Sequence, residues 1–497
     1  MGVVTWLLVG AVVVLVWAYS RRCHSYWSSR GIISPPAVTF LGHTHELFSS
    51  QRRFFVDKFY RKYRRHKIWG AYEFLSPALI VADPDLLKHF LVKDFEHFVD
   101  RRVVGDQPGS IMSKVLSNKR GDDWKELRSL MSPTFSTGKM RGMYHLVCEK
   151  VHSLVSFCLK KAANNRPVDM KDMFNRFSMD TIASCAFGID CNSFSDSQPI
   201  FAEKAEAFFR IEGLRKMKFA LMVTMPRLYT ALGLKADTPE MEFFAKVSRE
   251  ATAAREKGRQ RRGDFLDILL EARDAEDGLH SGKRVLDENT LVAQSVLFLM
   301  SGYDTTAVTV TLASTLLARY PRHQQRLRHE MQELVKEHGS VTYQGVMEAK
   351  FLDACLNETL RLYPPGTMVE RECTKEYSVP GTDLILEPGT LIIVPVWSLH
   401  HDPQYWPDPE EFRPERFLPK NRDKIQSFTH IPFGMGPRNC FAMRFALMEV
   451  KAALAHLVLV ADLQLAPGQE ELRFENSPLT LRPSNGVTML LTPLTEK

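Results

Sequence analysis

Hydrophobic and polar positions divide the chain into an apolar start, a long region of helical periodicity and a later section of short strands. Residues 2–20 carry no charged side chain, and Arg21 and Arg22 follow at once. At a rise of about 1.5 Å per residue, a helix of this length nearly spans the hydrocarbon core of a bilayer. The pattern therefore predicts a transmembrane anchor over residues 1–20.

A cleaved signal peptide is the competing interpretation of this apolar run. Signal peptides begin with a basic segment, whereas the positive charges here come after the run. Positively charged flanks stay on the cytosolic side of a membrane. We therefore favour an uncleaved, single-pass anchor with the body of the protein in the cytosol.

The rest of the chain is predicted to form a linker and one large body. Residues 21–50 are basic and contain Pro35 and Pro36, which predict a stiff turn that sets how the body sits on the membrane. Residues 51–497 are then the globular body. Composition, with 44% hydrophobic and 25% charged residues, excludes a disordered, collagen-like or coiled-coil chain.

The periodicity of the body predicts a mainly α fold with small β-sheets. Its most informative helix begins near Asp287, an N-cap candidate, and ends at Tyr320, before Pro321. Such a helix is about 50 Å long, enough to cross a domain. We also expect helices over 322–338, ending near 363 and over 443–462, strands over 72–82, 377–379, 384–386 and 391–396, and a hairpin of 479–482 with 487–490 turned at Asn485 and Gly486.

The formal net charge of +7, from 65 Lys+Arg against 58 Asp+Glu, is unevenly spread. Residues 21–67 alone carry a net charge of +9, which leaves −2 on residues 68–497. Basic charge beside an apolar run suits an anionic membrane surface. Nucleic-acid binding would need a basic face on the folded body, so we expect none. The eight cysteines lack paired CxxC spacing and are expected to be reduced in the cytosol.

The loop of residues 433–440, Phe-Gly-Met-Gly-Pro-Arg-Asn-Cys, leads into a helix whose N-terminal end lies beside Cys440. A helix N-terminus favours a thiolate, which is the form that binds a soft metal or haem iron. For a lone cysteine, a buried inert thiol would be the favoured alternative. The surrounding pattern reverses this expectation, because it resembles the haem-binding signature FxxGxRxCxG of the cytochrome P-450 family.

That resemblance implies haem b as the cofactor, with the thiolate of Cys440 as the axial ligand of its iron. It also implies that Phe433 and Arg438 contact the haem. The sequence departs from the signature at Ala442, where the family usually has glycine. We expect the extra methyl group to adjust the packing around the haem without loss of the cofactor.

Glu358 and Arg361 lie three residues apart and therefore on one helical face. Such pairs are common on protein surfaces, but this one resembles the ExxR motif of the same family. Residues 412–417, Phe-Arg-Pro-Glu-Arg-Phe, resemble the partner motif. The resemblance implies a buried network of Glu358, Arg361 and Arg416 that holds the loop of Cys440 and takes no part in catalysis.

Residues 301–306, Ser-Gly-Tyr-Asp-Thr-Thr, lie in the middle of the long helix. They form a helix poorly, at a cost of about 1–2 kcal/mol relative to alanine, and threonine hydroxyls that bond to carbonyls open a polar notch. The segment resembles the family's AGxDTT oxygen-activation motif. By this resemblance, Gly302 leaves room for dioxygen, and Asp304 and Thr305 relay protons to it through water. Ser301 replaces the usual alanine, which is expected to change substrate fit or water placement.

Trp124 and Arg128 are four residues apart, one helical turn. Taken alone, they favour an amphipathic surface helix. They also resemble the WxxxR element of the family, whose side chains bind haem propionates. Matching the flanking segments adds Arg101, Arg371 and Arg438 as propionate ligands, a role suited to the forked donors of arginine.

These motifs occur in family order and cover essentially the whole chain, and the segment around Cys440 looks especially like the animal branch of drug-metabolising and insect detoxification enzymes. The resemblance implies that residues 51–497 are the haem domain of a monooxygenase in the endoplasmic reticulum membrane. Such an enzyme inserts one atom of dioxygen into lipophilic xenobiotics, steroids or fatty acids. Its electrons come from NADPH through a flavoprotein reductase.

Two other functions stay open. Relatives of the same fold isomerise or dehydrate peroxides without a reductase, but they often lack the acid and the threonine that Asp304 and Thr305 supply here. A haem-based sensor would have no need of a proton relay. Their presence favours oxygen activation.

Two surface predictions accompany this interpretation. The apolar stretch 208–234 is expected to line the substrate cavity and to make a second contact with the membrane, with ordinary core packing as the alternative. An acidic reductase is expected to meet a basic face, for which a merely solvated face is the alternative. The candidate residues of this face are Lys125, Lys139, Arg141 and Arg444.

Overall fold

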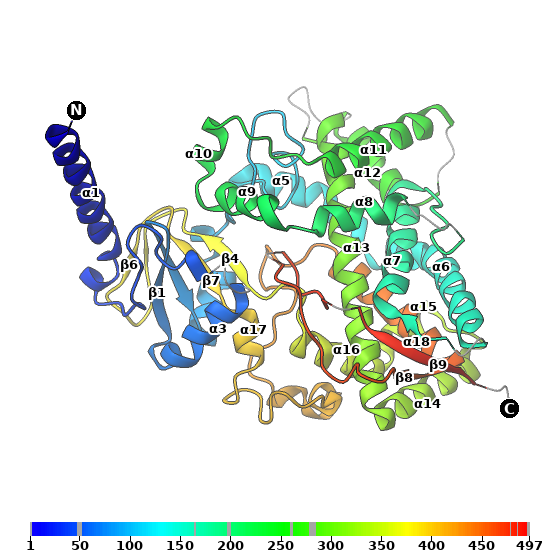
Figure 1. Cartoon of the computed structure of the whole chain (residues 1–497). Helices are drawn as coiled ribbons and strands as arrows, with labels where there is room; N and C mark the ends of the chain where they lie inside the picture. Colours follow the sequence, from blue (N-terminus) through cyan, green and yellow to red (C-terminus); the bar gives the residue numbers. More distant parts are fainter. Residues whose placement is uncertain are drawn as a thin grey trace.

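The computed structural model describes residues 2–46, 52–163, 166–195, 200–258, 262–277, 285–477, 479–484 and 486–494. Helices dominate this part of the chain, as the periodicity predicts, and three small sheets complete it (Figure 1). The helices are α1 Val3–His24, α3 Arg52–Tyr63, α4 Pro84–Lys88, α5 Gly121–Met131, α6 Thr137–Ala163, α7 Met170–Phe187, α8 Ile200–Phe209, α9 Gly213–Thr224, α10 Pro226–Ala231, α11 Pro239–Gly258, α12 Phe265–Asp277, α13 Glu288–Arg319, α14 Pro321–His338, α15 Tyr343–Glu348, α16 Lys350–Leu362, α17 Val396–His400 and α18 Met443–Val460.

Helix α13 is the central element of the body and crosses it from one side to the other (Figure 1). The carboxylate of Asp287 accepts a hydrogen bond from the Thr290 amide and caps the helix, while Pro321 begins the next helix, as expected from the sequence. Most of its side chains are buried against neighbouring helices, chiefly α7, α11 and α18. Its apolar length would suit a membrane span, but its burial shows that it is a core helix.

The largest sheet has the strand order β1-β2-β7-β4, with β1 Ile68–Glu73, β2 Ser76–Val81, β4 Val369–Glu372 and β7 Leu391–Val394. Strands β1 and β2 form a hairpin, so residues 72–82 are not the single strand that we expected. The chain turns at Phe74, whose φ of 52° lies in the left-handed region. The short strands β5 Tyr377–Ser378 and β6 Ile385–Leu386 lie where the sequence predicted strands, and they pair with each other.

The C-terminal strands differ from the expected hairpin. β9 Thr488–Pro493 pairs with β8 Ala461–Leu465 and with β3 Val168–Asp169, whereas residues 479–482 form no strand. Five residue pairs join β8 and β9, from Ala461 and Pro493 to Leu465 and Met489. Because β9 pairs with β8 and β3, the turn signal before residue 487 predicted the wrong partner for this strand. Asn485, the expected turn residue, lies outside the described residues.

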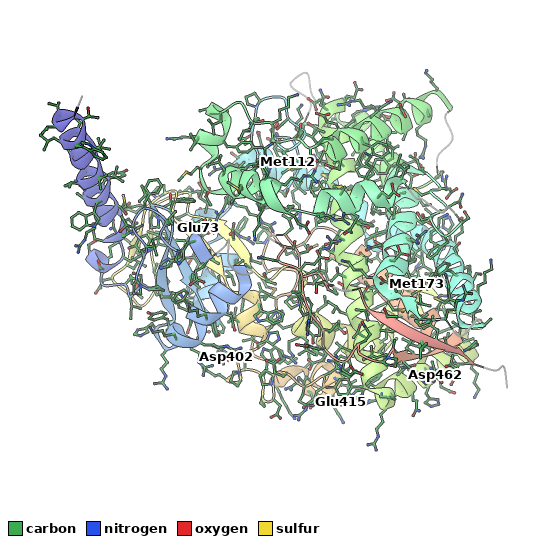
Figure 2. The ribbon with its side chains drawn as sticks, in the orientation of Figure 1. Glu73, Met112, Met173, Asp402, Glu415 and Asp462 are labelled. Carbon is green, nitrogen blue, oxygen red and sulfur yellow. The ribbon has the colours of Figure 1, made fainter. Side chains whose placement is uncertain are left out.

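Side chains fill the body (Figure 2), and its buried hydrophobic residues form two clusters. The larger surrounds α13 and includes Met173 of α7. The smaller lies around the β1-β2-β7-β4 sheet and includes Trp27. Asp402, below the sheet in Figure 2, accepts a hydrogen bond from Tyr60 at 2.8 Å. This bond joins α3 to the segment that follows α17.

Helix α1 projects from the body with its apolar side chains exposed (Figure 1). It continues to His24, and Ser20 is its only buried residue among those that the structure describes. The part of the predicted linker that is described, residues 21–46, packs against the β1-β2 hairpin and buries Trp27 completely. The division into an anchor over 1–20, a linker over 21–50 and a body over 51–497 stays a prediction.

Candidate active site

A cavity of about 420 Å³ lies between α13 and the loop that carries Cys440. Most of its wall is apolar, with a few polar groups at the edges. Several residues predicted from separate motifs meet at this wall, although they are far apart in the sequence. These are Arg101, Trp124, Arg128, Gly302, Thr305, Phe433, Arg438 and Cys440.

The loop before Cys440 is held by its own backbone. The Cys440 amide donates to the Phe433 carbonyl at 2.8 Å, and the Asn439 amide donates to the Gly436 carbonyl at 3.0 Å. Gly436 has a φ of 76°, and a Cβ there would lie 1.8 Å from the Leu91 carbonyl oxygen. Only glycine allows this approach. The loop therefore presents Cys440 at one fixed place in the cavity wall.

The pKa of the Cys440 thiol is raised, because burial outweighs the opposing effects of the Ala442 amide, Arg101 and Arg128. The expected helix N-terminus is present, since α18 begins at Met443 with Ala442 as its N-cap. This helix N-terminus is not sufficient by itself to lower the pKa of the Cys440 thiol and so favour the thiolate. A bound metal cation would supply the missing positive charge.

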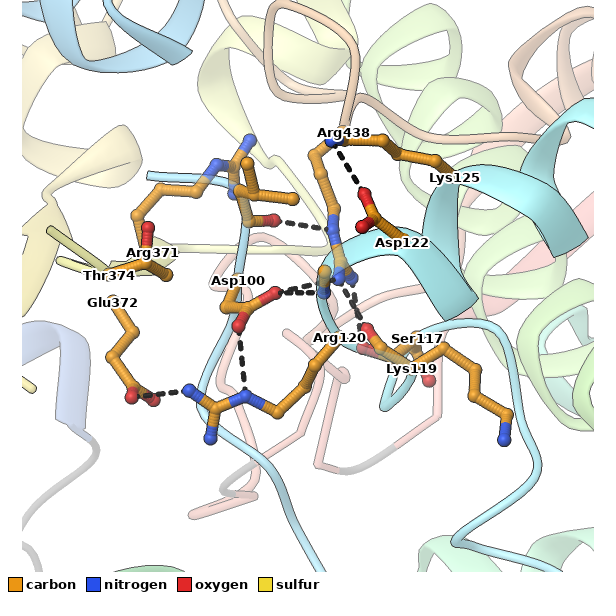
Figure 3. A network of polar contacts seen from close by, with 12 residues as sticks. Asp100, Ser117, Lys119, Arg120, Asp122, Lys125, Arg371, Glu372, Thr374 and Arg438 are labelled. Atoms are coloured by element: carbon orange, nitrogen blue, oxygen red, sulfur yellow. Dashed lines mark hydrogen bonds and ion pairs between the residues drawn. The ribbon is translucent and has the colours of Figure 1, made fainter. Parts of the chain in front are cut away.

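Three of the predicted propionate ligands are arginines that repel one another. Burial and Arg101 lower the pKa of Arg438 to about 9, and burial, Arg101 and Arg438 hold the pKa of Arg371 well below its ordinary value. In the described structure the Nε atoms of Arg101 and Arg371 have no hydrogen-bond partner. Asp100 lies 3.8 Å from Arg438, but it also binds Arg120 at 2.9 Å (Figure 3). Among the described residues, the arginines of the cluster therefore outnumber the carboxylates close to them, and the cluster is suited to hold further anions.

The WxxxR pair lies at the same wall. The Arg438 guanidinium lies over the Trp124 ring at 4.4 Å from its centroid, which fixes both side chains. Arg128 donates to the carbonyl and side-chain oxygens of Asn439 at 3.2 and 3.0 Å. Both residues of α5 therefore contact the loop that carries Cys440, Trp124 through Arg438 and Arg128 through Asn439.

The segment of residues 301–306 divides its side chains between two environments. Thr305 lines the cavity, and its hydroxyl donates to the Ser301 carbonyl at 2.6 Å. Asp304 does not line the cavity. Its carboxylate is fully buried, 2.9 Å from Arg482, and accepts a hydrogen bond from Thr480 at 2.5 Å. Arg482 and Thr480 hold this carboxylate away from the cavity wall, and the relay through Asp304 stays a prediction.

Gly302 also has a steric role in packing, besides the one expected from the sequence. A Cβ at this position would lie 2.9 Å from Cδ1 of Ile182 on α7. The Ser178 hydroxyl, also on α7, donates to the Gly302 carbonyl at 3.1 Å and the Tyr303 carbonyl at 2.9 Å. The glycine therefore allows α7 to approach α13 closely, and its predicted space for dioxygen stays a prediction.

The three residues of the predicted network meet as expected. Both carboxylate oxygens of Glu358 bind Arg361, at 2.7 and 2.9 Å, and one lies 3.3 Å from Arg416. Arg361 also donates to the His400 carbonyl at 2.9 Å. The Arg413 amide donates to Glu358 at 2.9 Å. The network thus joins α16 to the segments before the Cys440 loop, and its glutamate and Arg361 are fully buried.

Comparisons with known proteins decide the family. The sequence model of the cytochrome P450 family matches residues 33–491. The chain belongs to the cytochrome P450 family. It is 35% identical over 459 residues to cytochrome P450 3A41 of Mus musculus, with 91% of this chain and 90% of that protein covered. It is 36% identical over 459 residues to cytochrome P450 3A11 of Mus musculus, covering 91% and 90%, and 35% identical over 484 residues to cytochrome P450 9e2 of Blattella germanica, covering 91% of each.

Membership confirms the predicted fold class, the monooxygenase class and the cofactor of this P450. Members of the family carry haem b, with a cysteine thiolate as the axial ligand of the iron. The cavity fits this group by its own chemistry. It brings one thiol to a largely apolar wall, and Arg101, whose Nε is unpartnered in the described structure, lies at that wall with Arg128 and Arg438 as donors that suit two propionates.

Two residues of this P450 that sequence reasoning missed act on α13 from other elements. Arg482 holds Asp304, and a basic residue in the apolar tail was the signal that could have revealed it. Glu449 lies fully buried on α18, a largely apolar helix whose other charged residues are Arg444 and Lys451. Burial raises the pKa of Glu449 well above its ordinary value, against the opposing effect of the Thr306 and Ser178 hydroxyls. Glu449 is therefore a buried acid with a raised pKa, next to Thr306 of the oxygen-activation motif.

We expect Glu449→Gln to change how stability depends on pH. The raised pKa means that unfolding releases a proton, so this group stabilises the fold below the unfolded pKa and loses that effect as pH rises toward the folded pKa. Above the unfolded pKa, the free energy of unfolding of the variant should rise relative to that of the wild type by up to about 1.4 kcal/mol per pH unit. Urea unfolding between pH 5 and 8 measures the difference.

The control for this prediction is Glu126→Gln, which removes an exposed acid from α5. Its free energy of unfolding should follow that of the wild type at every pH. If Glu449→Gln also follows the wild type at every pH, burial does not raise the pKa of this carboxyl and the prediction is wrong.

Proposed function

We propose that this P450 is a membrane-anchored monooxygenase that inserts one atom of dioxygen into lipophilic substrates, with electrons from NADPH through a flavoprotein reductase. The observation that carries the proposal is the meeting of Cys440 and Thr305 across one largely apolar cavity. The reaction takes up two electrons and two protons for each dioxygen, so that the second oxygen atom leaves as water. Xenobiotics, steroids and fatty acids are the substrate classes that such a wall accepts.

When bound, haem b supplies an iron that activates dioxygen. Around the haem, the residues of the chain orient the substrate, exclude water and supply protons. Cys440 binds the iron, and Arg101, Arg371, Arg438, Trp124 and Arg128 are proposed to bind the propionates.

The cavity wall orients the substrate and excludes water, with Phe298 and Leu297 of α13 among its apolar side chains. The Thr305 hydroxyl holds a proton at Oγ1 at the edge of this wall. We assign the proton supply to Thr305 and Asp304. Glu358, Arg361 and Arg416 only hold the scaffold.

The membrane part of the proposal rests on two exposed apolar surfaces. Helix α1 presents its apolar side chains to solvent, and α9 and α10 lie on the side of the body from which α1 projects (Figure 1). The large apolar side chains exposed on and after α9 and α10 are Leu214, Met217, Leu228 and Leu232. We propose a single-pass anchor in the endoplasmic reticulum membrane, a cytosolic haem domain, and substrate entry from the lipid beside α9 and α10.

The reductase is proposed to meet the basic face named from the sequence. Two of its residues already have acidic neighbours, Lys125 with Asp122 at 2.9 Å and Lys139 with Glu271 at 3.3 Å. These pairs are exposed and therefore weak, so an acidic partner can replace them.

The test is a reconstituted reaction in lipid with NADPH, a flavoprotein reductase and ¹⁸O-labelled dioxygen. Steroids, fatty acids and synthetic pesticides are first screened by the change that each causes in the haem absorption spectrum. We expect each binding compound to yield a product with one labelled oxygen atom, and no product without reductase. Conversion of a peroxide without reductase would favour the isomerase or dehydratase alternative, and ligand binding without any turnover would favour a sensor.

A further inference from the structure

His400 is the last residue of α17, and it lies between the Glu358 network and the segment that leads to Cys440. Its side chain is fully buried. Its carbonyl accepts a hydrogen bond from Arg361 at 2.9 Å, which ties α17 to α16 beside it (Figure 1). The backbone of His400 is therefore part of the network that holds the scaffold, and its imidazole ring makes two further hydrogen bonds.

The two nitrogen atoms of this ring have opposite partners. Nδ1 lies 3.2 Å from the Arg361 carbonyl oxygen, which only accepts hydrogen bonds, so Nδ1 carries a proton. The Ile431 amide donates to Nε2 at 2.9 Å, so Nε2 carries none. The two backbone groups thus fix one neutral tautomer of the ring. In this form His400 joins α16 to the chain just before the Cys440 loop.

Ile431 continues the connection into the Cys440 loop. Its side chain is buried, and its carbonyl accepts a hydrogen bond from the Gly434 amide at 2.9 Å. The residue before this glycine is Phe433, whose carbonyl accepts the hydrogen bond from the Cys440 amide at 2.8 Å. The hydrogen bonds therefore run from α16 through the His400 ring to the backbone that holds Cys440. They fix the start of the loop.

The other end of the loop is held separately. Arg101 donates to the Arg438 carbonyl, and Arg128 donates to the carbonyl and side-chain oxygens of Asn439. These two arginines line the cavity, whereas His400 does not. Loss of the His400 bonds should therefore loosen the start of the loop and leave its end attached. A loop that is attached at one end alone no longer presents its cysteine at one fixed place.

The surroundings of the His400 ring oppose a positive charge on it. The pKa of His400 lies well below its ordinary value, chiefly because the ring is buried, and His430, His401 and Arg361 lower it further. The hydrogen bond to the Arg361 carbonyl acts in the opposite direction but has the smaller effect. Glu358, the carboxylate of the same network, is bound by Arg361. The ring is therefore held neutral, with Nε2 as an acceptor.

His430 provides a comparison within the same site. Its ring is stacked on that of His400, with the ring centroids 5.2 Å apart. Its Nε2 lies 3.2 Å from the Asn357 carbonyl oxygen, and its ring also packs against Phe417. Among the described contacts of the His430 side chain, none is a hydrogen bond to the backbone of residues 431–440. Of these two neighbouring imidazoles, His400 is the one that bonds to the chain before Cys440.

We propose that His400 is a positioning residue for the ligand of the haem iron, because its ring fixes the start of the loop that presents Cys440. The proposal rests on the proposed role of Cys440 as that ligand. Groups that hold a metal ligand by hydrogen bonds set its orientation, and their loss typically weakens metal binding by about 10–100-fold. His400 acts through Ile431 and does not itself line the cavity.

The experiment compares two amide variants of His400 in the full-length, haem-loaded protein. The amide oxygen in His400→Gln extends to the position of Nε2 and can accept from Ile431, whereas the side chain in His400→Asn is one methylene group shorter and reaches only the position of Nδ1. His430→Asn is the matched control. Hydrogen exchange of the amides of residues 431–434, followed by mass spectrometry, measures how firmly the loop is held. The absorption band of the reduced carbon monoxide complex reports whether a thiolate binds the iron.

We expect the amides of residues 431–434 to exchange at least about 10-fold faster in His400→Asn than in the wild type. A part of the same protein should also lose the thiolate-type band. His400→Gln should restore both readings toward those of the wild type. His430→Asn should keep the readings of the wild type, because its bonds do not reach the loop.

A pH profile separates this role from simple packing. A proton on Nε2 would face the Ile431 amide donor and break the hydrogen bond. Because the folded pKa of His400 is lowered, the neutral ring stabilises the fold above the unfolded pKa of 6.5, and this effect is lost as the pH falls toward the folded pKa. The urea concentration at the midpoint of unfolding of the wild type should therefore fall relative to that of His400→Gln as the pH is lowered below 6.5.

The proposal is overturned if His400→Asn and His430→Asn give the same exchange rates and the same band, since the His400 ring then contributes packing alone. Faster exchange in His400→Asn with an unchanged band would also overturn it, because the loop would then not position the ligand. A thiolate-type band in Cys440→Ser would refute the ligand on which the proposal rests, while exchange over residues 431–434 still reports on the His400 bonds.

Discussion

Cys440→Ser should abolish oxygen insertion without disturbing the backbone of the loop that carries residue 440. A serine hydroxyl is close in size to the thiol, but it loses its proton far less readily and is a poor ligand where a thiolate is required. The Gly436 approach to Leu91 and the backbone bonds of the loop do not depend on sulfur. We expect NADPH-dependent product formation to fall by at least about 100-fold, which is about 2.7 kcal/mol in the activation free energy.

The haem absorption spectrum and the rate of product formation measure this prediction together. Cys23→Ser is the matched control, because Cys23 is a half-buried thiol at the end of α1 that does not line the cavity. It should leave both readings unchanged. A Cys440→Ser protein that kept a thiolate-type spectrum and a tenth of the activity would refute the assignment of the ligand.

The second large effect is expected from Glu358→Ala. The substitution leaves Arg361, which is fully buried, and Arg416 without their shared carboxylate. Breaking a buried ion pair by removing one partner costs about 3–5 kcal/mol. This is a large fraction of a typical free energy of unfolding of about 5–15 kcal/mol. The urea concentration at the midpoint of unfolding and the haem content per chain should both fall sharply.

Glu415→Ala is the control for this prediction. Glu415 binds Arg326 at 2.7 Å, but both side chains are nearly half exposed, so the pair should contribute less than about 1 kcal/mol. Glu358→Gln adds a further comparison, because it keeps the shape and removes only the charge. If Glu358→Ala unfolds at the same urea concentration as Glu415→Ala, the network does not hold the fold.

Sequence predicted well those features that depend on local chemistry or on a fixed motif. The N-cap at Asp287 and the stop at Pro321 define α13 because both act within one turn of the helix. Glu358 and Arg361 meet because a separation of three residues places them on one face. The position of Cys440 follows from a loop whose bonds are internal.

Features that depend on distant segments were less accessible. The pairing of β9 with β8 and β3 is decided by strands from other parts of the chain, which a turn signal cannot indicate. Asp304 faces Arg482 across 178 positions of sequence, and Glu449 reaches α13 from α18. The attachment of Trp27 to β1 is of the same kind. For Arg482 and Glu449, the only sign in the sequence was a charged residue within a largely apolar segment.

The buried arginines also bear on how this protein is produced in a cell. Before haem arrives, Arg101, Arg371 and Arg438 crowd together with too few anions, and their repulsion weakens the fold. A ligand that binds only the folded state stabilises it by mass action. We therefore expect chains made during haem shortage to unfold and be degraded, so that the amount of protein that accumulates follows the supply of haem.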